Sequence, residues 1–370
     1  IRWRVLGPQS SDGLRAFAIE ADLDGFRFNK DNPMPFDMRF FSGAATVSDD
    51  IVLKDRREGK KSVTDWFLMH GVPLLRTIGT DDDLGGALVH ELELRGLHCG
   101  DKNGALKPCP ASAGSKADAL SDTAAVRSTV AIVAEWDTLY GRKLQQLFSF
   151  DREKQIAGFS VEGWYYLRGL DGRLPGDRAP AKASGAEKDA KEGGQDAIGG
   201  DGTFIERPEG RSQFDYLRRL ATRIGERDAA LRKAQPKGGG IRAVGVLGND
   251  VYDKLLVLQA LQSELPHAIF FTTDLDARLL LPSEQEWARN LIVASNFGLS
   301  LVDSLQNGFP PFRDSYQTSV YFSTLLALDK DSLASNSSAD ILGQTDQVKR
   351  WFKAPRVFEV SRSGFFDFSA

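Results

Sequence analysis

Acidic side chains recur in this sequence where an apolar stretch ends and a polar turn begins. They lie in short turns along the chain: Asp81, Asp82, Asp83, Glu135, Asp137, Asp250, Asp274 and Asp276. A carboxylate at such a turn first of all caps the helix that follows, because it accepts hydrogen bonds from free backbone N–H groups. If two or more of them face one cavity, they favour a ligand with an amine, or a metal ion, over a plain anion. Arg76, Arg278 and Arg313 are near enough in sequence to neutralise several of them.

Motifs for catalysis or for metal binding are few. Asp274-Leu275-Asp276 resembles the D-x-D of metal-dependent sugar transferases, but no nucleotide-binding glycine loop or nucleophile–base pair accompanies it. The histidines are scattered without the spacing of a zinc site: His70, His90, His98 and His267. The sequence therefore indicates no enzyme, and we expect no catalytic residue, no metal site and no cofactor.

The elements that position these acids include the stretch from Ser128 to Phe148. Its unbroken apolar run, Val130 to Ala134, is typical of a parallel strand that is covered on both faces. The polar residues from Glu135 to Thr138 then break the run, and leucines at a helical spacing follow. A strand that leads directly into a helix is half of a βαβ unit, and the turn between them lies where open α/β sheets bind ligands.

The same arrangement recurs along the chain. An apolar strand from Ile241 to Leu247 ends in Gly248-Asn249-Asp250, and a leucine-rich helix follows at once. Gly79-Thr80-Asp81 has the same place after an earlier strand, which indicates two lobes of like construction. Further buried strands are predicted at Ala268 to Phe271 and at Leu291 to Ala294. The predicted fold class is α/β, with two Rossmann-like lobes of parallel sheet and a cleft between them.

Composition excludes several classes of protein. The chain has 370 residues, of which 41% are hydrophobic and 26% are charged, so it can form more than one folded core. Its net charge of −4, and the acids mixed into the Arg-rich stretch at 211–233, argue against a nucleic-acid-binding surface. No run approaches the roughly 18 apolar residues of a membrane span, and we find no signal peptide. Because the chain begins at Ile1 inside a predicted strand, we expect it to be a segment of a longer protein.

Two tracts are predicted to be insertions. Residues 98–127 form a long connection rich in Gly, Ala, Ser and Lys that contains both cysteines, Cys99 and Cys109. The sequence leaves open whether these thiols are free or form a disulfide. The chain has almost no bulky residue from Pro175 to Gly202, and we expect a mobile loop there, within an insertion at about 171–211. Deleting this loop should cost little stability.

Five short motifs occur in one order along the chain. They are Gly7 to Ser11 (G-P-x-S-S), Ser42 to Thr46 (S-G-A-A-T), Arg76 to Asp81 (R-T-x-x-T-D), Asp137 to Arg142 (D-x-x-Y-G-R) and the closing hairpin from Phe358 to Gly364. Together they resemble the type I periplasmic-binding-protein fold. This is the two-lobed "Venus flytrap" of amino-acid binding proteins and of receptor extracellular domains.

The resemblance implies how the chain is divided between the lobes. Residues 1–150 and 300–345 would form the first lobe, and residues 151–299 and 346–370 the second. The chain would cross between the lobes near 150, 300 and 345. Because the family has a further βαβ unit before its G-P-x-S-S turn, the first lobe is expected to be incomplete in this chain.

The resemblance also implies where a ligand binds. In this fold the N-termini of helices face the cleft and offer backbone N–H groups. The implied ligand-binding residues are Ser10, Ser11, Ala44 and Thr46 on the first lobe, Tyr140 near the crossing, and Asn249, Asp250, Asp274 and Phe297 on the second lobe. In family members the first-lobe hydroxyls hold a ligand carboxylate. With carboxylates on the facing lobe, a zwitterion such as an amino acid or a small peptide would satisfy both ends.

Two functions are consistent with these features. The first is a non-enzymatic module that binds a small polar, amine-bearing molecule, as a sensory or solute-capture domain in a periplasmic or extracellular protein. The alternative is a ligand-free scaffold domain that docks on other subunits or domains of a larger assembly. An open cleft lined by Ser, Thr and Tyr would support the binding module, whereas a cleft filled by the chain's own side chains would support the scaffold.

Overall fold

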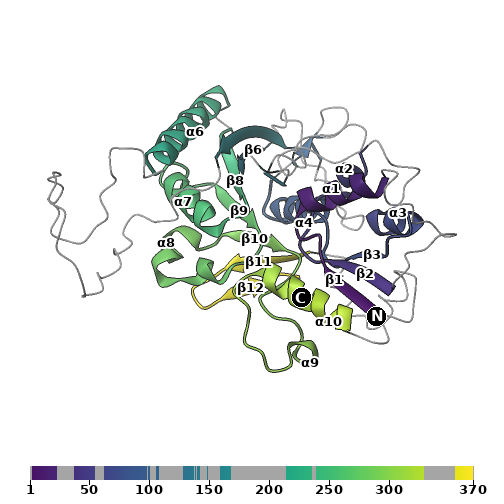
Figure 1. The fold of residues 1–370 in the computed structure, drawn as a ribbon. Coiled ribbons are helices and arrows are strands. Elements are labelled where there is room, and N and C mark those ends of the chain that lie inside the picture. Colours follow the sequence, from purple (N-terminus) through teal and green to yellow (C-terminus); the bar gives the residue numbers. More distant parts are fainter. Residues whose placement is uncertain are drawn as a thin grey trace, which may run out of the picture.

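A computed structural model shows two parallel sheets in one chain (Figure 1). It describes residues 2–22, 37–54, 62–97, 99–100, 106–107, 128–136, 138, 140–141, 148, 159–167, 214–235, 239–328 and 355–369. We call the part built on the three-stranded sheet the small body (described residues of 2–76, with 315–328). We call the part built on the seven-stranded sheet the large body (described residues of 81–295, with 355–369).

The small body is a parallel sheet with helices packed on it. Its strands lie in the order β1-β2-β3, with β1 at Arg2–Leu6, β2 at Asp37–Ser42 and β3 at Leu74–Arg76. Its first helices are α1 (Ser11–Asp22), α2 (Asp49–Val52) and α3 (Val63–Met69). Leu14, Phe67 and Leu74 lie in the shared core of these elements, where none of them is more than 1% exposed.

The large body contains a seven-stranded sheet in the order β12-β11-β10-β9-β8-β6-β7. Its strands are β6 (Thr129–Glu135), β7 (Ser160–Tyr166), β8 (Ile241–Leu247), β9 (Ile269–Thr273), β10 (Ile292–Ser295), β11 (Arg356–Val360) and β12 (Phe365–Asp367). Strands β6 to β10 pair in parallel, and the hairpin of β11 and β12 adds antiparallel pairs at one edge. All residues of β6 are buried, as the apolar run predicts.

Helices cover both faces of the large sheet, which is why its central strands are apolar on both sides. On one face lie α6 (Phe214–Ala234), α7 (Val251–Gln262) and α8 (Gln285–Ala288), which pack against residues such as Val133 and Val244 (Figure 1). On the other face lies α4 (Asp81–Leu94), which packs Leu84, Leu88 and Leu92 against residues of β6, β8 and β10. Thr80 and Asp83 form a capping box that fixes the start of α4.

Shorter elements complete the described part of the chain. They are the antiparallel pair β4 (Cys99–Gly100) and β5 (Leu106–Lys107), the 3-10 turns η1 (Ala277–Leu280) and η2 (Pro282–Glu284), and the helices α9 (Asp303–Gln306) and α10 (Ser315–Leu328). Among the described residues, no helix combines the length and the apolar character that crossing a membrane requires.

Helix α10 returns the chain to the small body, where it packs against β1 and β2. Small residues bring it close to the sheet: Ser319 Oγ donates a hydrogen bond to the carbonyl of Gly43 at 2.5 Å, and the hydroxyls of Thr77 and Ser323 are 2.5 Å apart. A Cβ atom on Gly43 would overlap the hydroxyl of Ser323, so the close approach requires glycine there.

The α/β fold class with mostly parallel sheets is confirmed, but the sheets do not divide the chain near residue 150 as expected. Helix α4 and strand β6 were expected in the first lobe, and both belong to the large body. They belong there because β6 is buried on both faces of the sheet, and the apolar side of α4 packs on one of these faces. The chain instead leaves the small body between Arg76 and Asp81, where Gly79 lies beside Asn296.

Several expectations fall wholly or partly outside the described residues. The tract from Pro175 to Gly202 and the crossing near 345 lie there entirely. So do most of the connection at 98–127 and Cys109, together with the side chain of Cys99. The state of the two thiols and the cost of deleting the loop therefore stay predictions.

Candidate functional site

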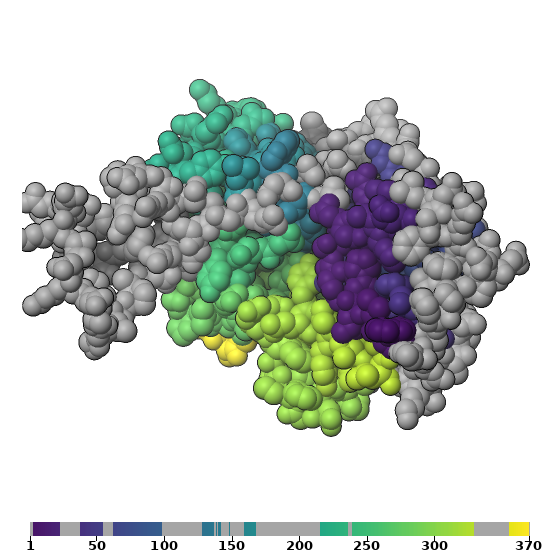
Figure 2. Space-filling view, viewed as in Figure 1, coloured from purple at the N-terminus to yellow at the C-terminus, as the bar shows by residue number. Residues whose placement is uncertain are grey.

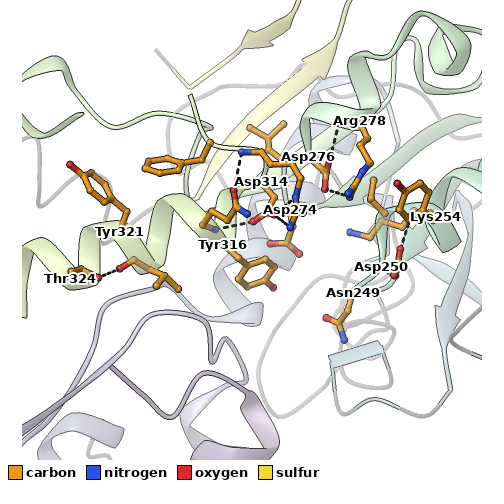
Figure 3. A pocket seen from close by; sticks show the side chains of 17 residues that line it. Asn249, Asp250, Lys254, Asp274, Asp276, Arg278, Asp314, Tyr316, Tyr321 and Thr324 are labelled. Carbon is orange, nitrogen blue, oxygen red and sulfur yellow. Dashed lines mark hydrogen bonds and ion pairs between the residues drawn. The ribbon is translucent and has the colours of Figure 1, made fainter. Parts of the chain in front are cut away.

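A cavity of about 830 Å³ lies between the large body and α10 (Figure 3). In Figure 2 the yellow-green surface that includes α10 adjoins the purple N-terminal segment on one side and the green surface of the large body on the other. The cavity is lined by Asn249, Asp250, Val251, Tyr252, Lys254, Asp274, Leu275, Asp276, Arg278, Phe312, Arg313, Asp314, Tyr316, Gln317, Val320, Tyr321 and Thr324. Both bodies therefore contribute to its walls.

The turn after β8 forms one wall. Asp250 caps α7, since its carboxylate accepts a hydrogen bond from the backbone N–H of Tyr252 at 2.7 Å. Buried Glu135, at the end of β6, accepts a hydrogen bond from the backbone N–H of Asn249 at 2.5 Å and holds the turn in place. A Cβ atom on Gly248 would lie 2.7 Å from Glu135 Oε1, so the turn needs glycine at this position. Glu135 is thus a positioning residue of the turn and does not line the cavity.

Asp274 follows β9 and has a left-handed backbone, with φ of 63°, which aspartate tolerates better than most residues. Its carboxylate accepts a hydrogen bond from the hydroxyl of Tyr140 at 2.8 Å and also interacts with the hydroxyls of Thr273 and Tyr316. Burial raises the pKa of Asp274, while the ammonium of Lys254 and these hydroxyls oppose the rise. Asp274 is therefore a buried acid whose charge is supported by internal donors.

Lys254 lies one turn into α7 and is only 4% exposed. Its ammonium donates a hydrogen bond to the carbonyl of Thr273 at 2.8 Å. Burial lowers the pKa of Lys254, and the nearby carboxylates of Asp274, Glu135 and Asp276 oppose that change. The cavity therefore has a fixed cationic group next to Asp274.

Two further acid–base pairs lie on the same side of the cavity. Asp276 accepts hydrogen bonds from the backbone N–H of Arg278 at 2.8 Å and from its guanidinium at 3.4 Å. The guanidinium of Arg278 lies 4.5 Å from the centre of the Tyr252 ring. Arg313 and Asp314 form an ion pair at 2.9 Å. Burial raises the pKa of Asp276, and Arg278 opposes the rise.

The small body reaches this region through Tyr316, the second residue of α10. The Tyr316 hydroxyl interacts with Asp274 of the large body and with Thr46 of the small body. Burial raises the pKa of Tyr316 well above 10. Asp81 lies behind this contact, fully buried, and its backbone N–H donates a hydrogen bond to the Thr46 carbonyl at 2.7 Å. Burial raises the pKa of Asp81 to about 7, with a further rise from Asp274 and an opposing effect from Arg76.

The structure brings together part of the predicted site. Asn249, Asp250 and Asp274 line the cavity. Tyr140 and Thr46 do not line it, but they support groups that do, since Tyr140 bonds to Asp274 and Thr46 interacts with Tyr316.

The other predicted residues lie elsewhere. Ser10 Oγ accepts a hydrogen bond from the backbone N–H of Gly13 at 3.0 Å, and Ser11 Oγ accepts one from the N–H of Val47 at 3.2 Å, so both hydroxyls serve the local backbone. Half-buried Ala44 does not line the cavity. Phe297 is 2% exposed and packs against Phe322 with ring centres 5.6 Å apart, so it is a core residue. Whether any predicted residue contacts a ligand stays a prediction.

The sequence reasoning missed Lys254 and Tyr316. Lys254 could have been found as the lysine that, next to Asp253, interrupts the otherwise largely apolar helix after Asp250. No local pattern distinguishes the hydroxyl of Tyr316 from those of other tyrosines.

Comparisons with known proteins identify the fold. No protein-family model matches the sequence, and no curated protein sequence matches it. The chain is similar to the structure of an ABC transporter substrate-binding protein from Desulfitobacterium hafniense, with 14% identity and a TM-score of 0.50, over 99% of this chain and 80% of the other. It is also similar to a solute-binding protein of an ABC transporter from Rhodopseudomonas palustris HaA2, solved with p-hydroxybenzoic acid, with 9% identity and a TM-score of 0.50, over 98% and 76%. The predicted resemblance is thereby confirmed at the level of the fold, and the chain has a type I periplasmic-binding-protein-like fold.

Proposed function

We propose that the chain is a non-enzymatic binding module that takes a small polar, amine-bearing molecule into the cavity between α10 and the large body. One observation carries the proposal: an open cavity of about 830 Å³ is lined by charged groups and is walled by both bodies. This volume lies within the range of about 300–1,000 Å³ that is usual for small-molecule sites. The similar structures are solute-binding proteins, and that function agrees with the proposal.

The charges in the cavity favour a cation. Its lining includes four carboxylates and three cationic side chains: Asp250, Asp274, Asp276 and Asp314 against Lys254, Arg278 and Arg313. With all seven groups ionised, the formal balance is negative by one charge, and a net positive group then gains Coulomb energy there. Because the Arg313 side chain is 54% exposed, it can also meet an anionic group at the opposite end of a zwitterion.

The two bodies act in this proposal as two lobes that close over the ligand. Asp274 and Asp250 belong to the large body and α10 belongs to the small body, so a ligand that contacts both favours their approach. Such modules capture a solute for transport or for sensing outside the cytoplasm, and we place this chain in a periplasmic or extracellular protein. The division at Arg76 to Asp81 replaces the one expected near residue 150.

The scaffold alternative is less well supported. It requires a cleft filled by the chain's own side chains, and the Tyr316 hydroxyl does occupy a position on Asp274. The cavity next to this contact nevertheless stays open, with charged residues on its walls.

The proposal is tested by removing one charge from the cavity. Asp274→Asn keeps the shape of the side chain and should weaken binding of an amine-bearing ligand by about 1.5–3 kcal/mol, the Coulomb attraction between unit charges about 6–10 Å apart at an effective dielectric constant of about 20. An analogue of the ligand without the amine should bind the variant almost as it binds the original protein. Thermal-shift screening of amino acids, polyamines and sugars, followed by calorimetry, measures both effects.

The matched control is Asp303→Asn, which changes an exposed acid outside the cavity lining and should leave binding unchanged. If no amine-bearing compound stabilises the original protein, the binding proposal fails and the scaffold becomes the better account.

A further inference from the structure

The carboxylates of the cavity already accept hydrogen bonds from within the chain. Asp276 is bonded to Arg278, and Asp250 to the backbone N–H of Tyr252. Both oxygens of Asp314 accept hydrogen bonds, one from the backbone N–H of Gln317 at 2.8 Å and one from Arg313 at 2.9 Å. Asp274 accepts one from Tyr140 and interacts with two further hydroxyls. Asp274, Asp276 and Asp314 are thus engaged within the chain, whereas the exposed Asp250 accepts its hydrogen bond through Oδ1.

This arrangement separates two kinds of cationic ligand. A primary ammonium has three N–H donors and is strongly hydrated, so it loses free energy when it leaves water without finding new acceptors. A quaternary ammonium has no N–H donor and needs only a negative potential and a surface to contact. Engaged carboxylates therefore penalise the first and still attract the second.

The cavity also has the surface that a methylated ammonium prefers. Four aromatic rings line it, those of Tyr252, Phe312, Tyr316 and Tyr321. The rings of Phe312 and Tyr321 lie 5.1 Å apart at an angle of 46°, on the side of the cavity that α10 forms. The face of the Tyr252 ring already holds the guanidinium of Arg278 at 4.5 Å, which shows that a cation lies stably on an aromatic face in this cavity.

We propose that the site selects a methylated ammonium head group, quaternary in preference to primary, held between the aromatic rings and the engaged carboxylates. This inference rests on the proposed binding function and names the class of amine that it takes. The volume of about 830 Å³ exceeds that of a trimethylammonium group, so a polar body can extend from the head group toward Arg313. The Tyr316 hydroxyl bonds to Asp274, so this ring and this carboxylate lie next to each other at the cavity (Figure 3).

Three matched pairs of compounds test the preference: glycine and N,N,N-trimethylglycine, ethanolamine and choline, and lysine and Nε-trimethyllysine. Titration calorimetry on the full chain should show the methylated member of at least one pair binding about tenfold more tightly, the scale of a desolvated cation–π contact. Phe312→Leu and Tyr321→Leu should each reduce that ratio at least severalfold. Phe366→Leu is the control, because Phe366 is 60% exposed and lies outside the cavity lining.

The outcomes separate this inference from the function on which it rests. If primary amines bind and methylation weakens or does not change their binding, the head-group inference is overturned and the binding function stands. If neither amines nor methylated amines bind the original protein, both are overturned. If either leucine variant fails to fold, which its melting curve shows, the ratios measured on the original protein still decide the matter.

Discussion

Replacing Asp81 by asparagine should make the protein more stable at alkaline pH. Asp81 is fully buried at the start of α4, and burial raises its pKa from 3.8 to about 7. A raised pKa means that the folded protein binds a proton at Asp81 over a pH range in which the unfolded chain has released it. The free energy of unfolding therefore falls as pH rises through that range.

The size of the effect follows from the two pKa values. Each unit of difference corresponds to about 1.4 kcal/mol, so the full cost of ionising Asp81 in place is about 4 kcal/mol. At about pH 4.5 the destabilisation by Asp81 is only about 1 kcal/mol, because this pH is less than one unit above the ordinary pKa of aspartate, at which the unfolded chain releases the proton. Between about pH 4.5 and about pH 8.5 the Asp81→Asn variant should therefore gain about 3 kcal/mol relative to the original protein.

Urea denaturation at these two pH values measures the effect. A burial penalty for the asparagine side chain itself does not depend on pH, so it cancels when the two differences are subtracted. Asp303→Asn is the control, and it should follow the original protein at both pH values because Asp303 is exposed. If Asp81→Asn also follows the original protein, the buried carboxylate is not destabilised by its surroundings and the reasoning is refuted.

Two further substitutions test the junction and the layers of the fold. Gly79→Ala should destabilise the protein by about 1–3 kcal/mol, because the added Cβ would overlap the amide of Asn296. In a double-mutant cycle, adding Asn296→Ala should recover part of that loss, and strictly additive losses would contradict the close approach of residues 79 and 296. Leu88→Ala should lower the free energy of unfolding by about 2–5 kcal/mol, since Leu88 is fully buried between α4 and the large sheet. Leu94→Ala is the control, because Leu94 is 69% exposed, and it should lower the free energy of unfolding by less than about 0.5 kcal/mol. Thermal or urea unfolding measures both, and equal losses would contradict the packing of α4.

The order and type of the main elements follow from local sequence patterns. The apolar run at Val130 to Ala134 predicts a strand buried on both faces, and β6 is one. Acids that follow such runs predict the helices α4 and α7. Asp250 caps α7 as expected, whereas the cap of α4 is Thr80, with Asp83 completing its capping box. These features are predictable because hydrogen bonds and side-chain periodicity within a few residues decide them.

The assignment of elements to the two bodies does not follow from local patterns. The apolar face of α4 would fit either sheet equally well by spacing alone. Its place is decided by the partner that it covers, namely the second face of β6 and its neighbours in the large sheet. Such a choice depends on contacts between residues far apart in the sequence, and a strand's own pattern does not state which sheet it joins.

The candidate site shows the same division. Asp250 and Asp274 were predicted through the family resemblance, which implies that the turns after their strands face the cleft. Tyr316 was not, since its contact with Asp274 depends on how the chain returns to the small body as α10 after β10. Phe297 also follows a strand, but the hydrogen bond from Ser295 Oγ to its carbonyl at 2.8 Å accompanies a turn that buries its ring.

In the proposed function, the contacts between the bodies would couple a ligand in this cavity to their relative position. The chain passes between them at Gly79 and again near Asn296, and Asn296 donates a hydrogen bond to the Gly79 carbonyl at 3.4 Å. Beside the cavity, residue 276 pairs with residue 314, and the backbone N–H of Ala277 donates to the Arg313 carbonyl at 2.7 Å. These links hold one edge of the cavity, whereas Tyr316 on Asp274 bridges the bodies through side chains alone. In the proposed function, a ligand that competes with Tyr316 for Asp274 would act on one side-chain contact between the bodies, and its differential contact with the two arrangements would set how far it can shift them.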